Sequence, residues 1–405
     1  PTTATPREPA VCLLISAFHP RVGGGETHAR LLSRELCARG TPIFVLTRRH
    51  DRALSARDVV DGVAVYRVGP AGLPRWGKYA MLLPAVLRLS RERRRYDIIY
   101  VCGLRVLGLA GILAGSLLNK RVVLRAEACG ELSGAFVFQN VEQAAKGLHP
   151  ALRGLMRTRN AWYRRADAFL AISRVIRDEF TACGVPADRI ATITNGINFS
   201  RFAPPDAATR DAMRNALGLR DAFVFAYAGK LNRGKGLEML LRVWATLAPE
   251  WPTARLLLIG GGGTQFLSCE RELRAFVAAH GLEGSVRFTG YTDRVADHLG
   301  AADAFVFPSE SEALGLALIE AMACGLPALA SATGGILDIV EDGVTGRLLP
   351  VGDEPAWRAA MLDLARNPGN ALRWAEAGRK SVRERFAIET VARLHQNLFR
   401  EICRL

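Results

Sequence analysis

Short apolar runs alternate with longer helical patterns along the whole chain. In the first half these runs are VCLLISA, PIFVLT, VAVYRV, DIIYVC and RVVLRA, and in the second half they are AFVFAYAG, ARLLLIG, SVRFTG, DAFVFP and LPALAS. Apolar runs of strand length that are separated by helical segments predict parallel strands with helices on both faces of the sheet. The pattern therefore predicts an α/β fold built from Rossmann-like domains.

The length of the chain and one proline-rich segment indicate how these elements divide. A chain of 405 residues is longer than a typical single domain, so two domains are expected. Adjacent prolines at positions 204 and 205 interrupt both periodicities within residues 198–210, which we interpret as the linker. We therefore expect a first domain over residues 1–203 and a second domain that begins at residue 204.

Two features bear on the compartment. The longest apolar run, residues 106–118, is bounded by Arg105 and Lys120. It is shorter than the roughly 20 residues that span a membrane, so we interpret it as a buried helix. The first residues show no basic region followed by a long apolar stretch and a cleavage site, so no secretory signal is expected and a cytoplasmic location is favoured.

The eight cysteines include no C-x-x-C pair and no histidines at zinc-ligand spacing. This scatter predicts reduced thiols and no structural metal site.

The positive charge of the chain lies in its first half. Residues 1–203 carry 31 Lys or Arg and 15 Asp or Glu, whereas the remaining residues carry 23 and 24. Basic side chains alternate with Leu, Met and Trp in residues 75–95 and 152–165. Segments of this kind suit an anionic membrane surface. The alternative is a solvated helix face in a chain that uses 48 Arg against six Lys.

A glycine loop follows the first predicted strand. Gly23, Gly24 and Gly25 precede Glu26, and a helix is expected from about Thr27. Consecutive glycines let the backbone approach a ligand, and N–H groups beside a helix N-terminus favour phosphate. An ordinary turn is the alternative. A dehydrogenase would also carry glycines here, but GGGE lacks the G-x-G-x-x-G spacing.

Two lysines mark the first strand end of the second half. Lys230 and Lys235 are two of only six lysines in the chain and flank a turn in AGKLNRGKG. Paired ammonium groups can offset the charge that develops on a departing diphosphate. A solvated loop with incidental charges is the alternative.

Two carboxylates flank a third turn. Glu312 and Glu320 lie eight positions apart around Gly315, and a helix is expected over residues 314–324. The N–H groups of Gly315 and Leu316 would then lie at a helix N-terminus, which attracts anions. One carboxylate could accept hydrogen bonds from a sugar and the other from a ribose. An ordinary exposed charge pattern is the alternative.

Five segments occur in an order that resembles the retaining glycosyltransferases of family 4, which have the GT-B fold. They are HPRVGGGETHARLLSRELCARG at 19–40, NGINFSRF at 195–202, YAGKLNRGKGLEMLL at 227–241, the pair of glutamates, and RFAIETVARL at 385–394. The resemblance implies two Rossmann-like domains that face a central cleft. It also implies an acceptor domain at 1–203, a donor domain at 204–384, and a C-terminal helix, about 385–405, that returns to the first domain.

The resemblance implies roles for most of these residues. Glu312 would hold hydroxyls of the transferred sugar, and Glu320 would bind the ribose. Contacts to the nucleobase are expected near Gly290 and Tyr291, although a packed core tyrosine is equally compatible with the sequence. The donor-binding set is Gly24, Gly25, Lys230, Lys235, Gly290, Tyr291, Glu312, Gly315, Leu316 and Glu320.

Two positions depart from the family pattern. Lys230 stands where the family usually has arginine, and lysine cannot form the bidentate fork with phosphate. The segment RVVLRAEACGELSG lacks the histidine that many relatives carry and offers Arg125, Glu127, Glu131 and Ser133 instead. Either Glu127 or Glu131 could orient the acceptor hydroxyl, and purely structural charges are an equal alternative. The catalytic candidates are therefore Lys230, Lys235, Glu312 and Glu127.

The predicted function is transfer of a hexose from a UDP- or GDP-sugar to a hydroxyl of a saccharide, a lipid-linked saccharide or a polysaccharide, with retention. The basic first half also fits action at the inner face of a membrane, and a soluble acceptor is the alternative. The sequence contains no D-x-D motif, so neither a metal nor another cofactor is expected. A sugar-nucleotide epimerase and a non-catalytic sugar-nucleotide sensor remain alternatives. A nucleic-acid-binding protein would fit the net charge of +15, but no recognisable module is present, so no nucleic acid partner is expected.

Overall fold

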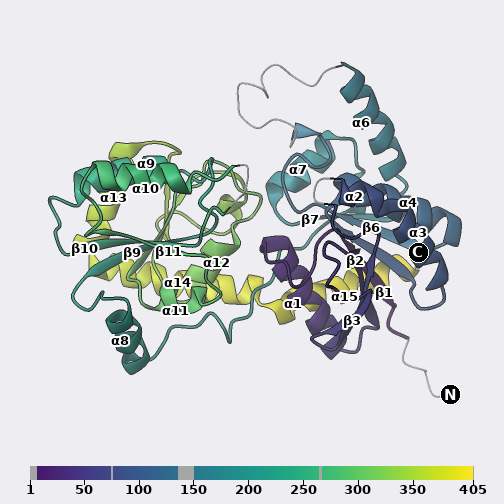
Figure 1. The fold of residues 1–405 in the computed structure, drawn as a ribbon, viewed down its shortest axis with the longest axis horizontal. Helices are drawn as coiled ribbons and strands as arrows, with labels where there is room; N and C mark the ends of the chain where they lie inside the picture. Colours follow the sequence, from purple (N-terminus) through teal and green to yellow (C-terminus); the bar gives the residue numbers. More distant parts are fainter. Residues whose placement is uncertain (1–6, 74–75, 136–149, 264–266, 405) are drawn as a thin grey trace. The chain divides into compact units, whose positions relative to one another are not determined.

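The computed structural model describes residues 7–73, 76–135, 150–263 and 267–404. Its contacts divide the chain into two compact units (Figure 1). Unit 1 comprises Pro1–Gly196 and Ile388–Leu405, and unit 2 comprises Ile197–Ala387. Each unit contains one sheet covered by helices, which confirms the predicted two-domain α/β fold.

The sheet of unit 1 is parallel except at one edge. Its strand order is β3-β4-β2-β1-β5-β6-β7-β8, and only the β3–β4 pair is antiparallel. The inner strands are almost entirely buried, as expected for parallel strands covered on both faces, whereas the edge strand Arg57–Val60 is largely exposed. The strands are β1 (Val11–Ile15), β2 (Ile43–Arg48), β3 (Arg57–Val60), β4 (Val63–Val68), β5 (Ile98–Cys102), β6 (Arg121–Arg125), β7 (Ala168–Ala171) and β8 (Ile190–Thr192).

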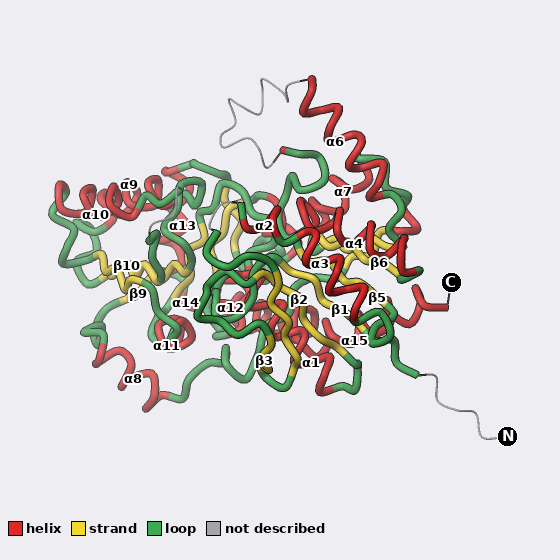
Figure 2. Tube along the Cα trace, turned by 45° about the vertical axis from the view of Figure 1, so that its right-hand side comes forward, coloured by secondary structure: helices red, strands yellow, loops and turns green. Residues whose placement is uncertain are grey.

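Helices cover both faces of this sheet (Figures 1 and 2). In both views α1 and α15 lie on one side, and α3 and α4 lie on the other. The helices of unit 1 are α1 (Gly24–Ala38), α2 (Gly77–Ala80), α3 (Leu82–Arg91), α4 (Leu104–Leu118), α6 (Pro150–Tyr163), α7 (Arg174–Ala182) and α15 (Ile388–Arg404).

The last helix of the chain is part of unit 1. Gln396 of α15 donates to the hydroxyl of Thr41 at 2.9 Å and accepts from Arg39 at 3.0 Å. His395 of α15 shares a 3.0 Å hydrogen bond with the hydroxyl of Tyr100 in β5. Polar contacts of the C-terminal helix therefore reach both α1 and the sheet.

The apolar run at residues 106–118 forms most of α4, and the structure shows this predicted buried helix to be buried on one face only. Leu107 and Ile112 are buried against the sheet, but Leu109, Leu113 and Leu117 are 38%, 40% and 69% exposed. One face of α4 is therefore apolar and open to solvent.

The sheet of unit 2 is fully parallel, with the order β11-β10-β9-β12-β13-β14. Its strands are β9 (Phe223–Ala228), β10 (Ala254–Ile259), β11 (Val286–Gly290), β12 (Ala304–Phe307), β13 (Ala328–Ser331) and β14 (Arg347–Leu349). Its helices are α8 (Ala207–Ala216), α9 (Leu237–Leu247), α10 (Glu270–Ala279), α11 (Val295–Gly300), α12 (Leu316–Ala323), α13 (Glu354–Arg366) and α14 (Pro368–Phe386). Figure 1 shows α9, α10 and α13 on one face of this sheet and α11, α12 and α14 on the other.

The parallel arrangement positions the candidate residues. Parallel strands bring their carboxyl ends to one edge of a sheet, which is where open α/β sheets bind ligands. In unit 1, Gly24 follows β1 and Glu127 follows β6. In unit 2, Lys230 follows β9 and Tyr291 follows β11. Each unit therefore presents its candidate residues at the carboxyl edge of its own sheet.

Candidate functional site

An ion pair joins two loops at the carboxyl edge of unit 2. Nζ of Lys235 lies 2.5 Å from Oε1 of Glu312, and the hydroxyl of Ser309 donates to the same oxygen at 3.1 Å. The N–H of Glu310 donates to the carbonyl of Gly234, which ties the backbones of the two loops together. Both charged side chains remain partly exposed, so a ligand can reach them.

Two glycines contact the backbone of the Glu312 loop, and they were not identified from the sequence. Gly334 has a positive φ of 52°, and a Cβ there would lie only 2.1 Å from the carbonyl oxygen of Glu312. The N–H of Gly335 donates to the same carbonyl at 2.9 Å. The Gly-Gly pair, which is separated from the end of β13 by two residues, was the signal available in the sequence. Such a pair permits close backbone approach.

Helix α12 begins directly after this loop. It runs from Leu316 to Ala323, shorter at both ends than the expected 314–324, and Gly315 is its N-cap residue. Glycine has no side chain with which to cap the helix, so the first N–H groups are left for water or a ligand. The helix N-terminus, Lys235 and Glu312 therefore converge on one side of the sheet edge.

Glu320 lies within α12 and is half-buried. Burial raises the pKa of its carboxyl to about 7, and the charge of Arg201 opposes this shift. A carboxyl group in this environment can accept a hydrogen bond when ionised and donate one when protonated. Both forms suit a hydroxyl partner.

Lys230 follows β9, and Gly290 and Tyr291 lie at the end of β11, with β10 between the two strands. The side chain of Lys230 is exposed and has no partner among the residues that the structure describes. Gly290 ends β11, and the ring of Tyr291 is 73% exposed. The alternative of a packed core tyrosine at position 291 is therefore wrong.

In unit 1 the glycine loop and Glu127 are neighbours. Helix α1 begins at Gly24, earlier than the expected start at about Thr27, because Gly23 is already extended and serves as the N-cap residue. A Cβ on Gly25 would lie 2.8 Å from Oε2 of Glu127. Gly24 and Gly25 thus belong to the first helical turn, and the absence of a side chain at Gly25 makes room for the carboxylate.

A buried arginine holds Glu127. Arg125 is fully buried, and its Nε lies 3.5 Å from Oε1 of Glu127. Its other nitrogens donate to the hydroxyl of Tyr100 at 3.3 Å and to the amide oxygen of Asn195. Burial opposes the charge of Arg125, but Glu127 and Tyr100 outweigh it and raise the pKa of the guanidinium. The role of Arg125 as a fixed cation, and the part of Asn195, were not recognised from sequence.

Glu127 retains unused hydrogen-bonding capacity. Its Oε1 is buried and accepts no hydrogen bond from any described residue. Burial raises the pKa of the carboxyl, the charge of Arg125 opposes this, and Glu26 raises it further. Unsatisfied buried acceptors are rare in folded proteins, and they point to a function or a missing partner.

Glu131 and Ser133 are occupied by the fold itself. Glu131 is 1% exposed, and its carboxylate accepts from the N–H of Leu104 at 2.9 Å. Burial raises the pKa of Glu131 to about 7. The hydroxyl and N–H of Ser133 both donate to Glu179. Of the two carboxylates considered for the acceptor hydroxyl, Glu127 is the one with a carboxylate oxygen that accepts no hydrogen bond from a described residue.

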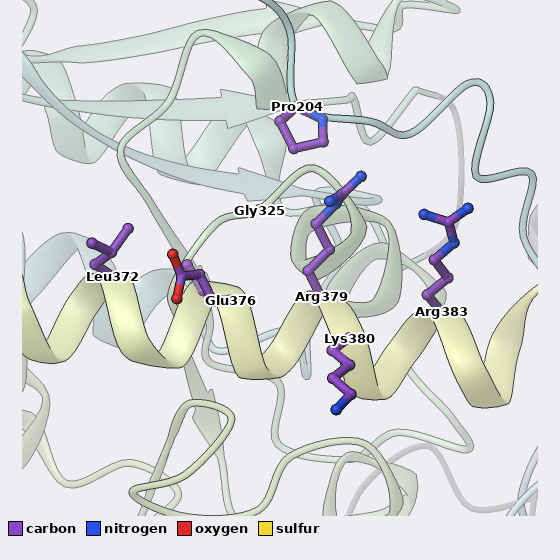
Figure 3. A pocket seen from close by; sticks show the side chains of 8 residues that line it. Pro204, Gly325, Leu372, Glu376, Arg379, Lys380 and Arg383 are labelled. Carbon is purple, nitrogen blue, oxygen red and sulfur yellow. The ribbon is translucent and has the colours of Figure 1, made fainter.

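A pocket of about 450 Å³ lies elsewhere in unit 2 (Figure 3). Gly325, in its wall, follows the C-terminal end of α12, whereas the candidate site lies at the N-terminal end of that helix. Figure 3 shows Arg379 and Arg383 of α14 pointing toward the side of Pro204, and Lys380 pointing away. This pocket therefore contains none of the candidate residues.

The described residues include neither a metal-binding cluster nor a helix that could span a membrane. No group of three or more His, Cys, Asp or Glu side chains is arranged to hold a metal ion. No helix combines the length and apolar character needed to cross a bilayer.

Comparisons with known proteins cover most of the chain. The model of Glycosyltransferase Family 4 matches residues 22–201, and the model of Glycosyl transferases group 1 matches residues 209–381. A D-inositol 3-phosphate glycosyltransferase from Xylanimonas cellulosilytica is 30% identical over 389 residues, which cover 91% of this chain and 89% of that protein. Another from Kribbella flavida is 30% identical over 367 residues, with coverage of 86% and 83%.

Solved structures share the fold at lower identity. HepE from Anabaena, in complex with UDP and glucose, has a TM-score of 0.77 at 19% identity and covers 98% of this chain and 100% of its own. Sucrose-phosphate synthase from Thermosynechococcus elongatus has a TM-score of 0.80 at 24% identity, with coverage of 98% and 99%.

Proposed function

This chain belongs to the family 4 glycosyltransferases of GT-B fold, and we propose that it transfers a hexose from a UDP- or GDP-sugar to an acceptor hydroxyl with retention at the anomeric carbon. The proposed acceptor is a saccharide, either lipid-linked or part of a growing polysaccharide. Solved proteins of the same fold contain UDP or UDP-glucose, which supports a nucleotide-sugar donor.

The observation that carries this proposal is the Lys235–Glu312 pair beside the uncapped start of α12. An ammonium group and unpaired N–H groups together favour a diphosphate. In the free protein Glu312 neutralises Lys235. When a diphosphate binds Lys235, the carboxylate of Glu312 is released to accept hydrogen bonds from the sugar. Glu320, with its raised pKa, is proposed to bind the ribose hydroxyls.

The proposed reaction is attack on the same face from which the diphosphate leaves. The bond between the anomeric carbon and the diphosphate oxygen breaks, and the acceptor oxygen forms a new bond to that carbon. The acceptor proton passes to the departing phosphate oxygen. Lys230, Lys235 and the N–H groups of α12 stabilise the negative charge that develops there. Glu127 accepts a hydrogen bond from the acceptor hydroxyl and orients it. No step in this scheme uses a metal.

A two-stage experiment tests the proposal. A thermal-shift panel of UDP-, GDP- and ADP-sugars identifies the donor as the compound that raises Tm most. At equal concentrations, the ligand that binds most tightly stabilises the folded state most. Transfer to a saccharide acceptor is then followed by NMR of the new glycosidic bond. Retained anomeric configuration is expected. Release of a sugar epimer, binding without turnover, or an inverted product would each contradict the proposal.

We further propose that α2 and α3 bring unit 1 to an anionic membrane. Four large apolar side chains of this segment are exposed: Trp76 by 73%, Tyr79 by 48%, Leu83 by 68% and Leu87 by 51%. Exposed apolar clusters of this kind mark interaction surfaces. Lys78, Arg91, Arg93 and Arg94 are exposed in the same stretch and would attract acidic headgroups.

Vesicle sedimentation tests this surface. The protein should pellet with vesicles that contain phosphatidylglycerol and stay in solution with phosphatidylcholine alone. The double variant Leu83→Ser/Leu87→Ser should lose most of this binding. Leu372→Ser removes a leucine that is 61% exposed in unit 2, and it should pellet as the parent does. Equal pelleting of the double variant and the parent would contradict the assignment of this surface.

A further inference from the structure

One buried arginine of unit 1 has no carboxylate partner among the residues that the structure describes. Arg48 is the last residue of β2 and is 8% exposed. Its Nε has no hydrogen-bond partner, and no carboxylate among the described residues pairs with its guanidinium. Nearby arginines have partners, since Arg49 donates to the carbonyls of Leu54 and Arg52, and Arg67 pairs with Asp58 at 2.9 Å, although its Nε also lacks a partner. Arg48 is thus a largely buried cation with no carboxylate partner among the described residues.

The surroundings of Arg48 are positive. Burial lowers the pKa of its guanidinium, and the charge of Arg21 lowers it further. Burial lowers the pKa of His50 most, and the charges of Arg21, Arg48 and Arg67 lower it further. A buried cation without a partner costs free energy that a bound anion could recover. Positive charges held together here therefore indicate an anionic ligand rather than a structural ion pair.

The backbone makes room for this guanidinium. A Cβ on Gly77 would lie 2.7 Å from Nη1 of Arg48, closer than such atoms approach. Gly77 is the first residue of α2 and is itself buried. Any larger residue at position 77 would displace the arginine head group, so the position of Arg48 depends on this glycine.

Arg48 lies at the same edge of the sheet as Glu127. Strands β2, β1, β5 and β6 are adjacent and parallel, so the ends of β2 and β6 are three strand spacings apart, about 14 Å. Both residues therefore belong to one ligand-binding edge. A single extended acceptor can present a hydroxyl to Glu127 and an anionic group to Arg48.

We propose that Arg48, assisted by Arg21 and His50, binds a phosphate group carried by the acceptor. The inference rests on the proposed glycosyl transfer and specifies the acceptor as a phosphorylated molecule. A guanidinium can bind phosphate through two parallel hydrogen bonds, which an ammonium cannot do. The phosphate belongs either to a soluble sugar phosphate or to a lipid-linked acceptor, because both present the same group.

Calorimetric titration with inorganic phosphate tests the site without any sugar donor. Arg48→Gln should weaken phosphate binding at least about tenfold, as expected for the loss of a charged hydrogen-bonding partner. Gly77→Ala keeps every charge but shifts the guanidinium, and Arg21→Gln removes an exposed cation; both should weaken binding less. The matched control is Arg57→Gln, which removes an exposed arginine of β3 in the same unit and should bind phosphate as the parent does.

Thermal unfolding separates a binding role from a structural one. Since Arg48 is an uncompensated buried cation, Arg48→Gln should leave the ligand-free Tm unchanged or raise it. A lower Tm together with unaltered phosphate binding in Arg48→Gln and Gly77→Ala would overturn the inference. If Arg48→Gln does not fold, the result for Gly77→Ala decides.

Competition distinguishes the two sources of phosphate. A hexose phosphate that competes with inorganic phosphate in an Arg48-dependent manner supports a soluble acceptor. Competition only by vesicles that contain an anionic glycerophospholipid supports a lipid-linked acceptor. Competition by neither overturns the inference. If the protein transfers sugar but ignores phosphate, only this inference fails; if it binds phosphate through Arg48 but never transfers sugar, the proposed function fails.

Discussion

The carboxyl edges of the two sheets hold their charged groups in different ways. In unit 2, Lys235 and Glu312 form a partly exposed pair at 2.5 Å, joined by one hydroxyl. In unit 1, Arg125 is wholly buried and bound on several sides, whereas Arg48 is largely buried with no carboxylate partner in the described part of the chain. The pair in unit 2 can exchange partners when a ligand arrives. Arg125 of unit 1 is held by residues of the fold, and we propose that a ligand completes the coordination of Arg48.

Removal of Lys235, whose ammonium group can exchange Glu312 for a ligand, should have the largest effect on activity. Lys235→Ala should reduce kcat/KM by about 10²- to 10³-fold, because a positioned charge that stabilises the leaving group is lost. Steady-state kinetics with the identified donor measure this. Lys380→Ala, which removes another lysine of unit 2, is the matched control and should retain full activity. A Lys235→Ala variant that matched this control would contradict the exchange described for unit 2.

Loss of Glu320 should weaken donor binding more than it slows chemistry. Glu320→Ala should raise KM for the donor by about 10- to 100-fold, since hydrogen bonds to a charged group contribute roughly 1.5–3 kcal/mol. The raised pKa predicts that Glu320→Gln, which keeps a hydrogen-bonding side chain, is milder than the alanine variant. Equal KM values for the parent and Glu320→Ala would exclude a role for this side chain in donor binding.

The ionisation of Glu127 in unit 1 should affect the pH profile of kcat/KM. Burial raises the pKa of Glu127 above its ordinary value, so kcat/KM should begin to fall at a higher pH than for an exposed glutamate as the medium is acidified. Glu127→Gln should reduce kcat about tenfold and abolish this acidic limb. If Glu127→Gln keeps the limb of the parent, the titrating group is another residue.

Glu131 should affect stability rather than activity, and its effect should be the smallest. Its folded-state pKa of about 7 lies above the ordinary value of 4.5. Below pH 4.5 the carboxyl is protonated in both the folded and the unfolded states, and its contribution to stability is fully present. Between about pH 4.5 and 7 the unfolded state ionises first, so this contribution is lost as pH rises.

Thermal unfolding of Glu131→Gln across this pH range checks that sign. Glutamine cannot ionise, so the Tm of the variant relative to the parent should rise by several degrees from pH 4.5 to pH 8. Asp188→Asn, which removes an exposed carboxylate of the same unit, serves as control and should show no such trend. A Tm difference that stays constant with pH would show that burial of Glu131 does not carry the predicted penalty.

The fold was predictable because periodicity and motifs agreed. Alternating apolar runs indicated two α/β domains, and the helix after Gly315 was expected because the turn glycine precedes an apolar stretch. Local patterns of this kind are set by neighbours in sequence. The open face of α4 was not predictable, because Leu117 is apolar whether or not another helix covers it.

Residues whose roles depend on tertiary packing could not be identified from the sequence. The role of Arg125 depends on Tyr100 and Asn195, which come from distant segments. Nothing in the local sequence distinguishes Arg48 from Arg49, although Arg48 pairs with no carboxylate of the described residues and Arg49 binds backbone carbonyls. Burial and pairing of an arginine are properties of the folded sheet edge.

A crystal structure with the nucleoside diphosphate bound would test the proposed donor site directly. The diphosphate should lie within hydrogen-bond distance of Nζ of Lys235 and of the N–H groups at the start of α12, with the Lys235–Glu312 contact lengthened from 2.5 Å. A nucleotide that lies away from Lys235 and Glu320, with the ion pair intact, would exclude this site.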